Sequence, residues 1–294
     1  MPILEMSTCL ACGKKNLVSY PAKFSEFIAH RVFAGRNNSF HLLHCQDCGF
    51  AFYDYRFSDD EVARLYHNYR DEVYQRQRQQ YEKWYSEEYN ASLGISPKEI
   101  SHRKQTIIKS LAPYIQGENL LLLDFGGDRG QMIPALPHVI QNYVYDISAV
   151  KPEPGVLSLD SLDACYKQAP FDILLCCHVL EHVADPAVEV KDFASLLKKE
   201  GLLYLEVPFD SPFYTSWRSK WSILTNPYYS WKDLWNFWKS RHAKPIFELH
   251  EHINFFTLQA ARELLKRLGF HEVYSVSRGK PLPHILVAQL SNKV

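Results

Sequence analysis

From residue 96 onward, apolar and polar residues alternate between a strand-like pattern and a helical periodicity. Short apolar runs or strand-like patterns occupy residues 120–123, 143–148, 156–160, 171–177, 202–208, 271–276 and 284–290. Helical periodicity, with apolar residues three and four positions apart, covers residues 96–111, 187–199 and 258–268. Strands that alternate with helices at this spacing predict an α/β fold with a doubly wound, mostly parallel sheet of seven strands.

The first 95 residues have a different pattern. Strand-like alternation surrounds residues 40–44, and an acidic helix start at Ser58 is followed by an apolar stripe and many tyrosines. We therefore divide the chain into a small module at 1–55, a helical bridge at 56–95 and the α/β domain at 96–294. Residues 211–250 interrupt the α/β pattern as an aromatic-rich insertion.

Composition narrows the class of protein. Lys plus Arg and Asp plus Glu both number 33, so no net charge attracts nucleic acid, which we do not expect as a partner. No apolar stretch approaches the roughly 18 residues of a membrane span, and the N-terminus lacks a signal-peptide pattern. We expect a cytoplasmic protein.

Four of the seven cysteines form two Cys-x-x-Cys pairs, Cys9 with Cys12 and Cys45 with Cys48. Two such pairs can close a tetrahedral site, and four sulfur ligands leave no open position, so the pattern predicts structural zinc. With only about 50 residues around it, the site would contribute to folding itself. The alternative is four unligated thiols.

A glycine-rich loop follows the apolar run at 120–123. Gly126, Gly127 and Gly130 supply a tight turn and let a ligand approach the backbone closely. Asp146 ends the next strand about 20 residues after Asp124, where an acid can accept hydrogen bonds from a ribose. The alternative for Asp146 is an ordinary turn aspartate.

Two other segments have candidate chemistry. The sequence from His250 to His252 contains metal-ligand residue types, but its spacing indicates no third ligand, so we do not expect catalytic zinc. Five of the six tryptophans lie in the insertion beside lysines and arginines. Residues 217–241 therefore predict a lid over the substrate or a peripheral membrane contact, with core packing as the alternative.

In combination, these motifs resemble class I S-adenosylmethionine-dependent methyltransferases, which have a Rossmann-like sheet. The resemblance rests on the glycine loop, Asp146, the sequence Val179-Leu180-Glu181-His182-Val183 and Glu206-Val207-Pro208. The paired cysteines and the segment from Glu251 to Phe256 are similar to the zinc-containing branch that includes sugar C-methyltransferases.

The resemblance implies S-adenosylmethionine as cofactor. Its methionine end would lie against the glycine loop and Asp124, its ribose against Asp146 and Ile147, and His178 would close the pocket. The residues that would flank its adenine are Asp160, Ser161 and Leu162. Asp128 stands where the common pattern has a third glycine.

Methyl transfer from a sulfonium is an in-line displacement, and a hydroxyl acceptor must also lose its proton. We expect His252 to be the general base, Glu251 to orient its ring and Tyr74 to assist; a structural histidine is the alternative. The resemblance implies a sugar hydroxyl or carbon as acceptor, on a nucleotide sugar or a surface glycan. A lipid-linked glycan would place the protein at the inner face of the membrane.

Two other functions stay open at this point. One is a zinc-ribbon protein with a methyltransferase fold that binds or modifies RNA, which the neutral charge disfavours. The other is a non-catalytic scaffold. This alternative comes from Asp128, which stands where the common cofactor-binding pattern has a glycine.

Overall fold

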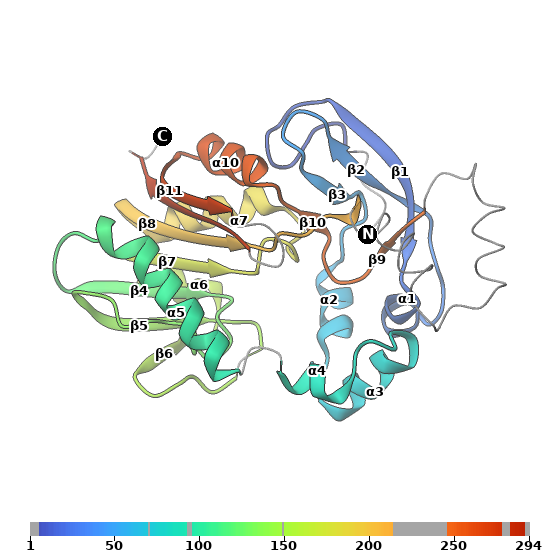
Figure 1. Ribbon diagram of the computed structural model, residues 1–294, viewed down its shortest axis with the longest axis horizontal. Helices are drawn as coiled ribbons and strands as arrows, with labels where there is room; N and C mark the ends of the chain where they lie inside the picture. The colour runs from blue at the N-terminus through green and yellow to red at the C-terminus, as the bar shows by residue number, and fades with distance from the viewer. Residues whose placement is uncertain are drawn as a thin grey trace.

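The computed structural model describes residues 6–69, 71–92, 96–148, 150–213, 246–277 and 283–291. Two β-sheets lie side by side in this part of the chain, with short helices packed around them (Figure 1). The tryptophan-rich residues 217–241 lie outside it, so their predicted role as lid, membrane contact or core is not described by the structure. Within the described residues, no helix combines the length and apolar character needed to cross a bilayer.

The larger sheet has seven strands in the order β11-β12-β8-β7-β4-β5-β6. The bounds of its strands are β4 Leu120–Phe125, β5 Val139–Tyr145, β6 Val156–Leu159, β7 Phe171–Cys177, β8 Leu197–Val207, β11 Phe270–Ser277 and β12 His284–Leu290. Only β12 runs antiparallel to its neighbours. This confirms the predicted seven-stranded, mostly parallel α/β sheet, and β4, which carries the glycine loop, lies between β7 and β5.

Helices cover both faces of this sheet. Helix α5 Pro97–Leu111 packs on one face, and α7 Pro186–Leu196 and α10 Leu258–Arg267 pack on the other, as does the short α6 Leu162–Gln168. Helix α7 ends three residues earlier than the pattern predicted, because Leu197 already pairs with Phe171 as the start of β8. The 3₁₀ turn η1 Ala112–Tyr114 leads from α5 toward β4.

The smaller sheet has five strands in the order β10-β3-β2-β1-β9. Its bounds are β1 Leu17–Phe24, β2 Phe40–Cys45, β3 Ala51–Tyr53, β9 Phe247–Leu249 and β10 Asn254–Phe255. Three strands come from the N-terminal module, whereas β9 lies at the end of the predicted insertion and β10 just after it, and these two strands pair with opposite edges of the three. The segment between them, residues 250–253, therefore crosses from one edge of this sheet to the other.

Three helices pack against the smaller sheet, α1 Glu26–Phe33, α2 Asp59–Tyr66 and α3 Glu72–Tyr81, and the short α4 Glu87–Ser92 follows α3. Helix α2 begins where Ser58 was expected to start it. The backbone N–H of Ser58 donates to Glu61 Oε2 at 2.8 Å, and the N–H of Glu61 donates back to Ser58 Oγ at 3.4 Å. This reciprocal cap satisfies two of the amide groups that a helix start leaves unpaired.

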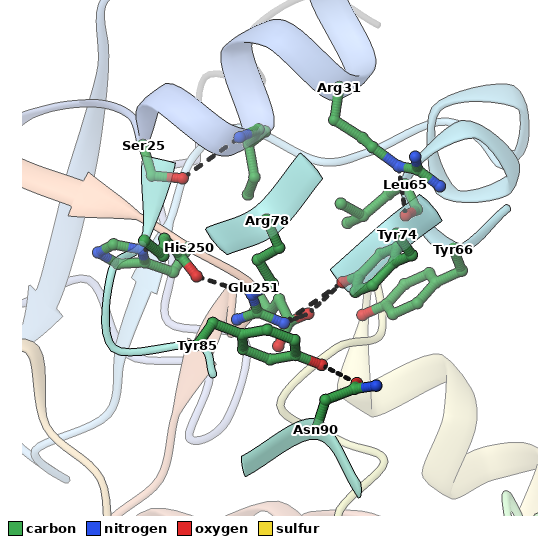
Figure 2. Close-up of polar contacts among 12 residues, drawn as sticks. Ser25, Arg31, Leu65, Tyr66, Tyr74, Arg78, Tyr85, Asn90, His250 and Glu251 are labelled. Carbon is green, nitrogen blue, oxygen red and sulfur yellow. Dashed lines mark hydrogen bonds and ion pairs between the residues drawn. The ribbon is translucent and has the colours of Figure 1, made fainter. Parts of the chain in front are cut away.

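A buried arginine joins α3 to the crossing segment (Figure 2). Arg78 is 4% exposed; its Nε donates to Glu82 at 2.7 Å and its Nη1 to Glu251 at 2.6 Å. The guanidinium lies 4.1 Å from the centre of the Tyr85 ring, and Glu82 also contacts His250 at 2.7 Å. Buried charges are tolerated only when paired, so these contacts hold residues 250 and 251 against α3.

We predict that Arg78→Met lowers the free energy of unfolding by roughly 3–5 kcal/mol, because it leaves Glu82 and Glu251 buried without their cation. Urea unfolding followed by circular dichroism measures the change. Arg76→Met is the matched control, since Arg76 is exposed on the same helix and lies 3.8 Å from Glu72. Its expected loss is below about 0.5 kcal/mol. Equal losses in the two variants would contradict the buried ion pair.

Candidate functional site

The glycine loop begins at the carboxyl end of β4 and lies tightly between its neighbours. The N–H of Gly126 donates to the carbonyl of Tyr145 on β5 at 2.7 Å. A Cβ atom at Gly127 would lie 2.3 Å from the Asp124 carboxylate, and one at Gly126 would lie 2.4 Å from Val179. No residue with a side chain fits these two positions without displacing its neighbours.

Asp128 occupies the turn without disturbing it. Its φ of 54° is in the left-handed region, which aspartate tolerates better than most residues with a side chain. Its N–H donates to Asp146 Oδ2 at 2.8 Å, and its carboxylate accepts from Gln131 at 3.2 Å. The aspartate that replaces the expected glycine therefore links the loop to the end of β5.

The residues expected at the ribose and adenine lie together at one edge of the sheet. Strands β5 and β6 pair in parallel, with Tyr145 opposite Leu159, so the residues that follow them are neighbours. Ile147 is 74% exposed, which leaves an apolar side chain free for a flat ring. Ser161 caps α6 by accepting from the N–H of Ala164. The set that this edge brings together is Asp146, Ile147, Asp160, Ser161 and Leu162.

Asp124 lies beneath the loop and is 1% exposed. Burial raises the pKa of Asp124 to about 7, although the nearby Arg103 opposes the shift. Its Oδ2 has no hydrogen-bond partner in the described part of the chain. A buried carboxylate oxygen without a hydrogen-bond partner favours a ligand group with a positive charge. S-adenosylmethionine carries two such groups, an ammonium and a sulfonium. These residues therefore fit the expected cofactor.

His178 ends β7 between two buried glutamates. Its Nδ1 lies 3.2 Å from Glu181 Oε1 and its Nε2 lies 3.0 Å from Glu206 Oε1. Burial lowers the pKa of His178, but the hydrogen bonds and charges of the two glutamates outweigh it and raise the pKa to about 9. Arg103 and Tyr204 also bind Glu206. At neutral pH the ring is therefore an imidazolium that donates on both sides and holds the end of β7 in place.

His252, the expected general base, has a different partner from the expected one. Its Nδ1 lies 3.2 Å from Asp210 Oδ2. Burial lowers the pKa of His252, whereas Asp210 and Glu181 raise it, and the net shift is upward. The ring of His182 meets it edge to face with centroids 4.8 Å apart.

Glu251 and Tyr74 do not contact His252 in the way that the sequence suggested. The Glu251 carboxylate accepts hydrogen bonds from Arg78 and, at 3.0 Å, from the hydroxyl of Tyr74 (Figure 2). Tyr74 is fully buried, and burial followed by the charge of Glu251 raises its pKa. The buried arginine requires the carboxylate as its partner, so Asp210 rather than Glu251 orients the His252 ring.

Of the His-Glu-His segment, only His252 lies in a cluster of metal-ligand type, together with two residues of the turn after β7. Glu181, His182 and His252 each offer one ligand atom, and these atoms lie within 4.8 Å of one another. His182 Nδ1 also lies 3.2 Å from the hydroxyl of Tyr66 on α2. No sequence pattern pointed to Asp210 or Tyr66, whereas Glu181 and His182 are adjacent in the sequence and could be recognised as a pair.

The four paired cysteines also converge. Cys9 and Cys48 have their Sγ atoms 3.6 Å apart, as do Cys12 and Cys45, and all four sulfurs lie within 4.8 Å of one another. Tetrahedral zinc with bonds of about 2.3 Å separates its sulfurs by about 3.8 Å, so the cluster fits that ion. Gly13 and Gly49, both with φ near 75°, let each pair turn back on itself.

Comparison with known proteins agrees with this geometry. A sequence profile described as a methyltransferase domain matches residues 98–275, more than half of the chain. No curated protein sequence matches the chain.

A structural search finds several solved structures similar to the chain. The 1,6-didemethyltoxoflavin-N1-methyltransferase of Burkholderia thailandensis is 15% identical, with a TM-score of 0.46 over 85% of this chain and 99% of that one. Magnesium protoporphyrin IX methyltransferase from Synechocystis PCC 6803 is 16% identical, with a TM-score of 0.38 over 68% and 89%. CurJ carbon methyltransferase is 15% identical, with a TM-score of 0.44 over 82% and 73%. At this similarity their acceptors are not carried over to this chain.

We predict that Asp124→Asn makes the protein more stable at pH 8 while weakening cofactor binding. The pKa of an ordinary aspartate is 3.8 and that of Asp124 in the folded protein is about 7, so the folded state holds the proton more tightly than the unfolded state. The protonated carboxyl therefore favours folding below pH 3.8, and this contribution is lost as the pH rises through 7. The amide removes this penalty, and the free energy of unfolding at pH 8 should rise by roughly 1–4 kcal/mol.

The measurement is urea unfolding of both proteins at pH 5 and pH 8, with calorimetry for the cofactor. Glu118→Gln, which removes an exposed carboxylate just before β4, is the control and should change neither quantity. A variant that is less stable than the parent at both pH values would refute the role given to burial.

Proposed function

Because the chain belongs to the methyltransferase domain family and is an S-adenosylmethionine-dependent enzyme, we propose that it methylates a sugar hydroxyl or carbon on a nucleotide sugar or surface glycan. The observation that carries the proposal is the His252–Asp210 pair beside the carboxyl end of the sheet. An imidazole oriented by a carboxylate is suited to remove a proton from a hydroxyl. The sugar class rests on the sequence resemblance to the zinc-containing branch.

The proposed reaction needs few protein groups. The acceptor oxygen forms a bond to the methyl carbon as the carbon–sulfur bond breaks, and the electron pair of that bond stays on sulfur. His252 activates the acceptor hydroxyl by taking its proton, and Asp210 stabilises the imidazolium that results. The glycine loop and Asp124 hold the donor, while the His178 imidazolium keeps the ends of β7 and β8 together.

An RNA acceptor is the alternative that the sequence left open. Tight binding of a nucleic acid requires a basic surface, and the chain has equal numbers of acidic and basic residues. We therefore favour the sugar acceptor. If the acceptor is lipid-linked, the tryptophan-rich residues 217–241 would be the part of the protein that contacts the membrane.

We also propose that the cysteine cluster holds structural zinc. Four thiolates fill the tetrahedron and leave no position for a substrate. The cluster lies against the C-terminal helix α10: Arg267 donates to the carbonyl of Leu10, and Thr257 donates to the carbonyl of Cys48 at 2.7 Å. The ion would therefore fix the N-terminal module to the methyltransferase sheet.

We predict that His252→Ala reduces methyl transfer roughly 100- to 10,000-fold, because the acceptor hydroxyl is no longer activated. Cofactor affinity should stay within about twofold, since the ring is not among the residues around the glycine loop. Transfer of label from methyl-labelled S-adenosylmethionine to nucleotide sugars measures the rate, and calorimetry measures the affinity.

His41→Ala is the matched control, because His41 forms a similar pair with Asp54 at 3.1 Å outside the site. It should leave the rate unchanged. Undiminished transfer by His252→Ala would overturn the assignment. Labelling of RNA with no labelling of any nucleotide sugar or glycan would overturn the acceptor class.

We predict that Cys45→Ser lowers the zinc content below one ion per chain and lowers the unfolding temperature, because metal binding and folding are coupled in so small a module. Elemental analysis and thermal unfolding measure the two effects. Cys165→Ala, a buried thiol in α6 away from the cluster, should keep one zinc per chain. Equal zinc content in both variants would contradict the four-cysteine site.

A further inference from the structure

Three side chains beside the proposed reaction centre form a cluster of metal-ligand type, with ligand atoms of Glu181, His182 and His252 within 4.8 Å of one another. Glu181 is 1% exposed. Its Oε1 accepts from His178, but its Oε2 has no hydrogen-bond partner among the described residues. A buried carboxylate oxygen in this state is costly unless a positive group faces it.

Both histidines have a partner at Nδ1, and His182 also has a hydrogen bond to the backbone of Glu251. His252 Nδ1 lies 3.2 Å from Asp210 Oδ2, and His182 Nδ1 lies 3.2 Å from the hydroxyl of Tyr66. Partners at Nδ1 fix the orientation of an imidazole and leave Nε2 as the ligand atom. This arrangement of outer partners is typical of histidines that bind metals.

The backbone brings the two ligand segments into a fixed register. The carbonyl of Glu181 accepts from the N–H groups of Ile253 and Asn254, at 2.9 and 3.1 Å. The Asn254 side chain donates to the carbonyls of Leu180 and Val183, at 2.9 and 2.8 Å. The turn after β7 and the crossing segment therefore meet in a defined geometry before any ligand arrives.

We propose that Glu181, His182 and His252 bind one divalent cation, which coordinates an acceptor with two adjacent oxygen atoms, such as a vicinal diol. The acceptor part rests on the proposed function, whereas cation binding does not. Two imidazoles and one carboxylate suit divalent first-row metals and leave coordination positions open. Two of these positions match the paired hydroxyls of a sugar.

With the cation bound, the role of His252 as metal ligand replaces the role of general base proposed above. As a ligand, the imidazole acts on the acceptor through the metal instead of taking the proton itself. The coordinated hydroxyl releases its proton to water, and its oxygen forms the bond to the methyl carbon. The carbon–sulfur bond breaks with its electron pair on sulfur, which gives S-adenosylhomocysteine and the methyl ether.

Manganese(II) is the probe for this site, because carboxylate and imidazole ligands accept it while the four thiolates select zinc. The full chain, with its zinc in place, is titrated with MnCl2, and free ion is followed by electron paramagnetic resonance. We expect one bound ion per chain, with imidazole nitrogen couplings in the spin-echo modulation. Neither S-adenosylmethionine nor acceptor is present, so failure of this test and failure of the proposed reaction are distinguishable.

Glu181→Gln and His252→Ala should each weaken manganese binding at least about tenfold, and His252→Ala should reduce the nitrogen couplings. Glu189→Gln, which removes a half-buried carboxylate from the neighbouring α7, is the control and should bind as the parent does. No bound ion at millimolar manganese, or binding without nitrogen couplings, overturns the proposal. The couplings are read on the parent protein, so the result stands even if a variant fails to fold.

Discussion

Asn254 is the contact on which the arrangement of this site depends. Its side chain donates to two carbonyls of the turn after β7, and its Oδ1 accepts from the buried Arg56 at 2.9 Å. One residue therefore joins a strand of the N-terminal sheet to the turn that carries Glu181 and His182. Because all of these groups are buried, each hydrogen bond lost would leave an unpaired polar atom, which makes the junction specific as well as stable.

The second constraint is the need to pair buried charges, and two buried ion pairs each hold one segment of the site in place. Arg78 holds the crossing segment against α3 through Glu251, and His178 holds the end of β7 against β8 through Glu206. Burying such groups costs more than burying apolar ones, so their value lies in the one geometry that satisfies every partner. Both networks end next to His252 or Glu181, the residues to which we assign the chemistry.

The sheet of the N-terminal module also contains strands from the C-terminal part of the chain, so the module is not a separate appendage. Its sheet incorporates β9 and β10, and the segment between these strands carries His250, Glu251 and His252. The four cysteines lie at the contact between this module and α10. A zinc ion there would stabilise the position of the crossing segment relative to the glycine loop, although the two are far apart in sequence.

The sequence by itself determined the seven strands, the place of the glycine loop after a buried strand, the residues at the carboxyl ends of β4, β5 and β6, and the convergence of the four cysteines. Each of these is encoded locally, by apolar periodicity, by glycine where a Cβ would collide, or by a fixed ligand spacing. Only the tertiary structure decided that Asp210 orients His252, that Glu251 pairs with Arg78, and that Glu181 and His182 meet His252 in one cluster. These partners are distant in the chain: Arg78 lies in α3, Tyr66 in α2 and Asp210 after β8. No local pattern specifies such contacts, because they are settled by burial and by the cost of unpaired buried charge.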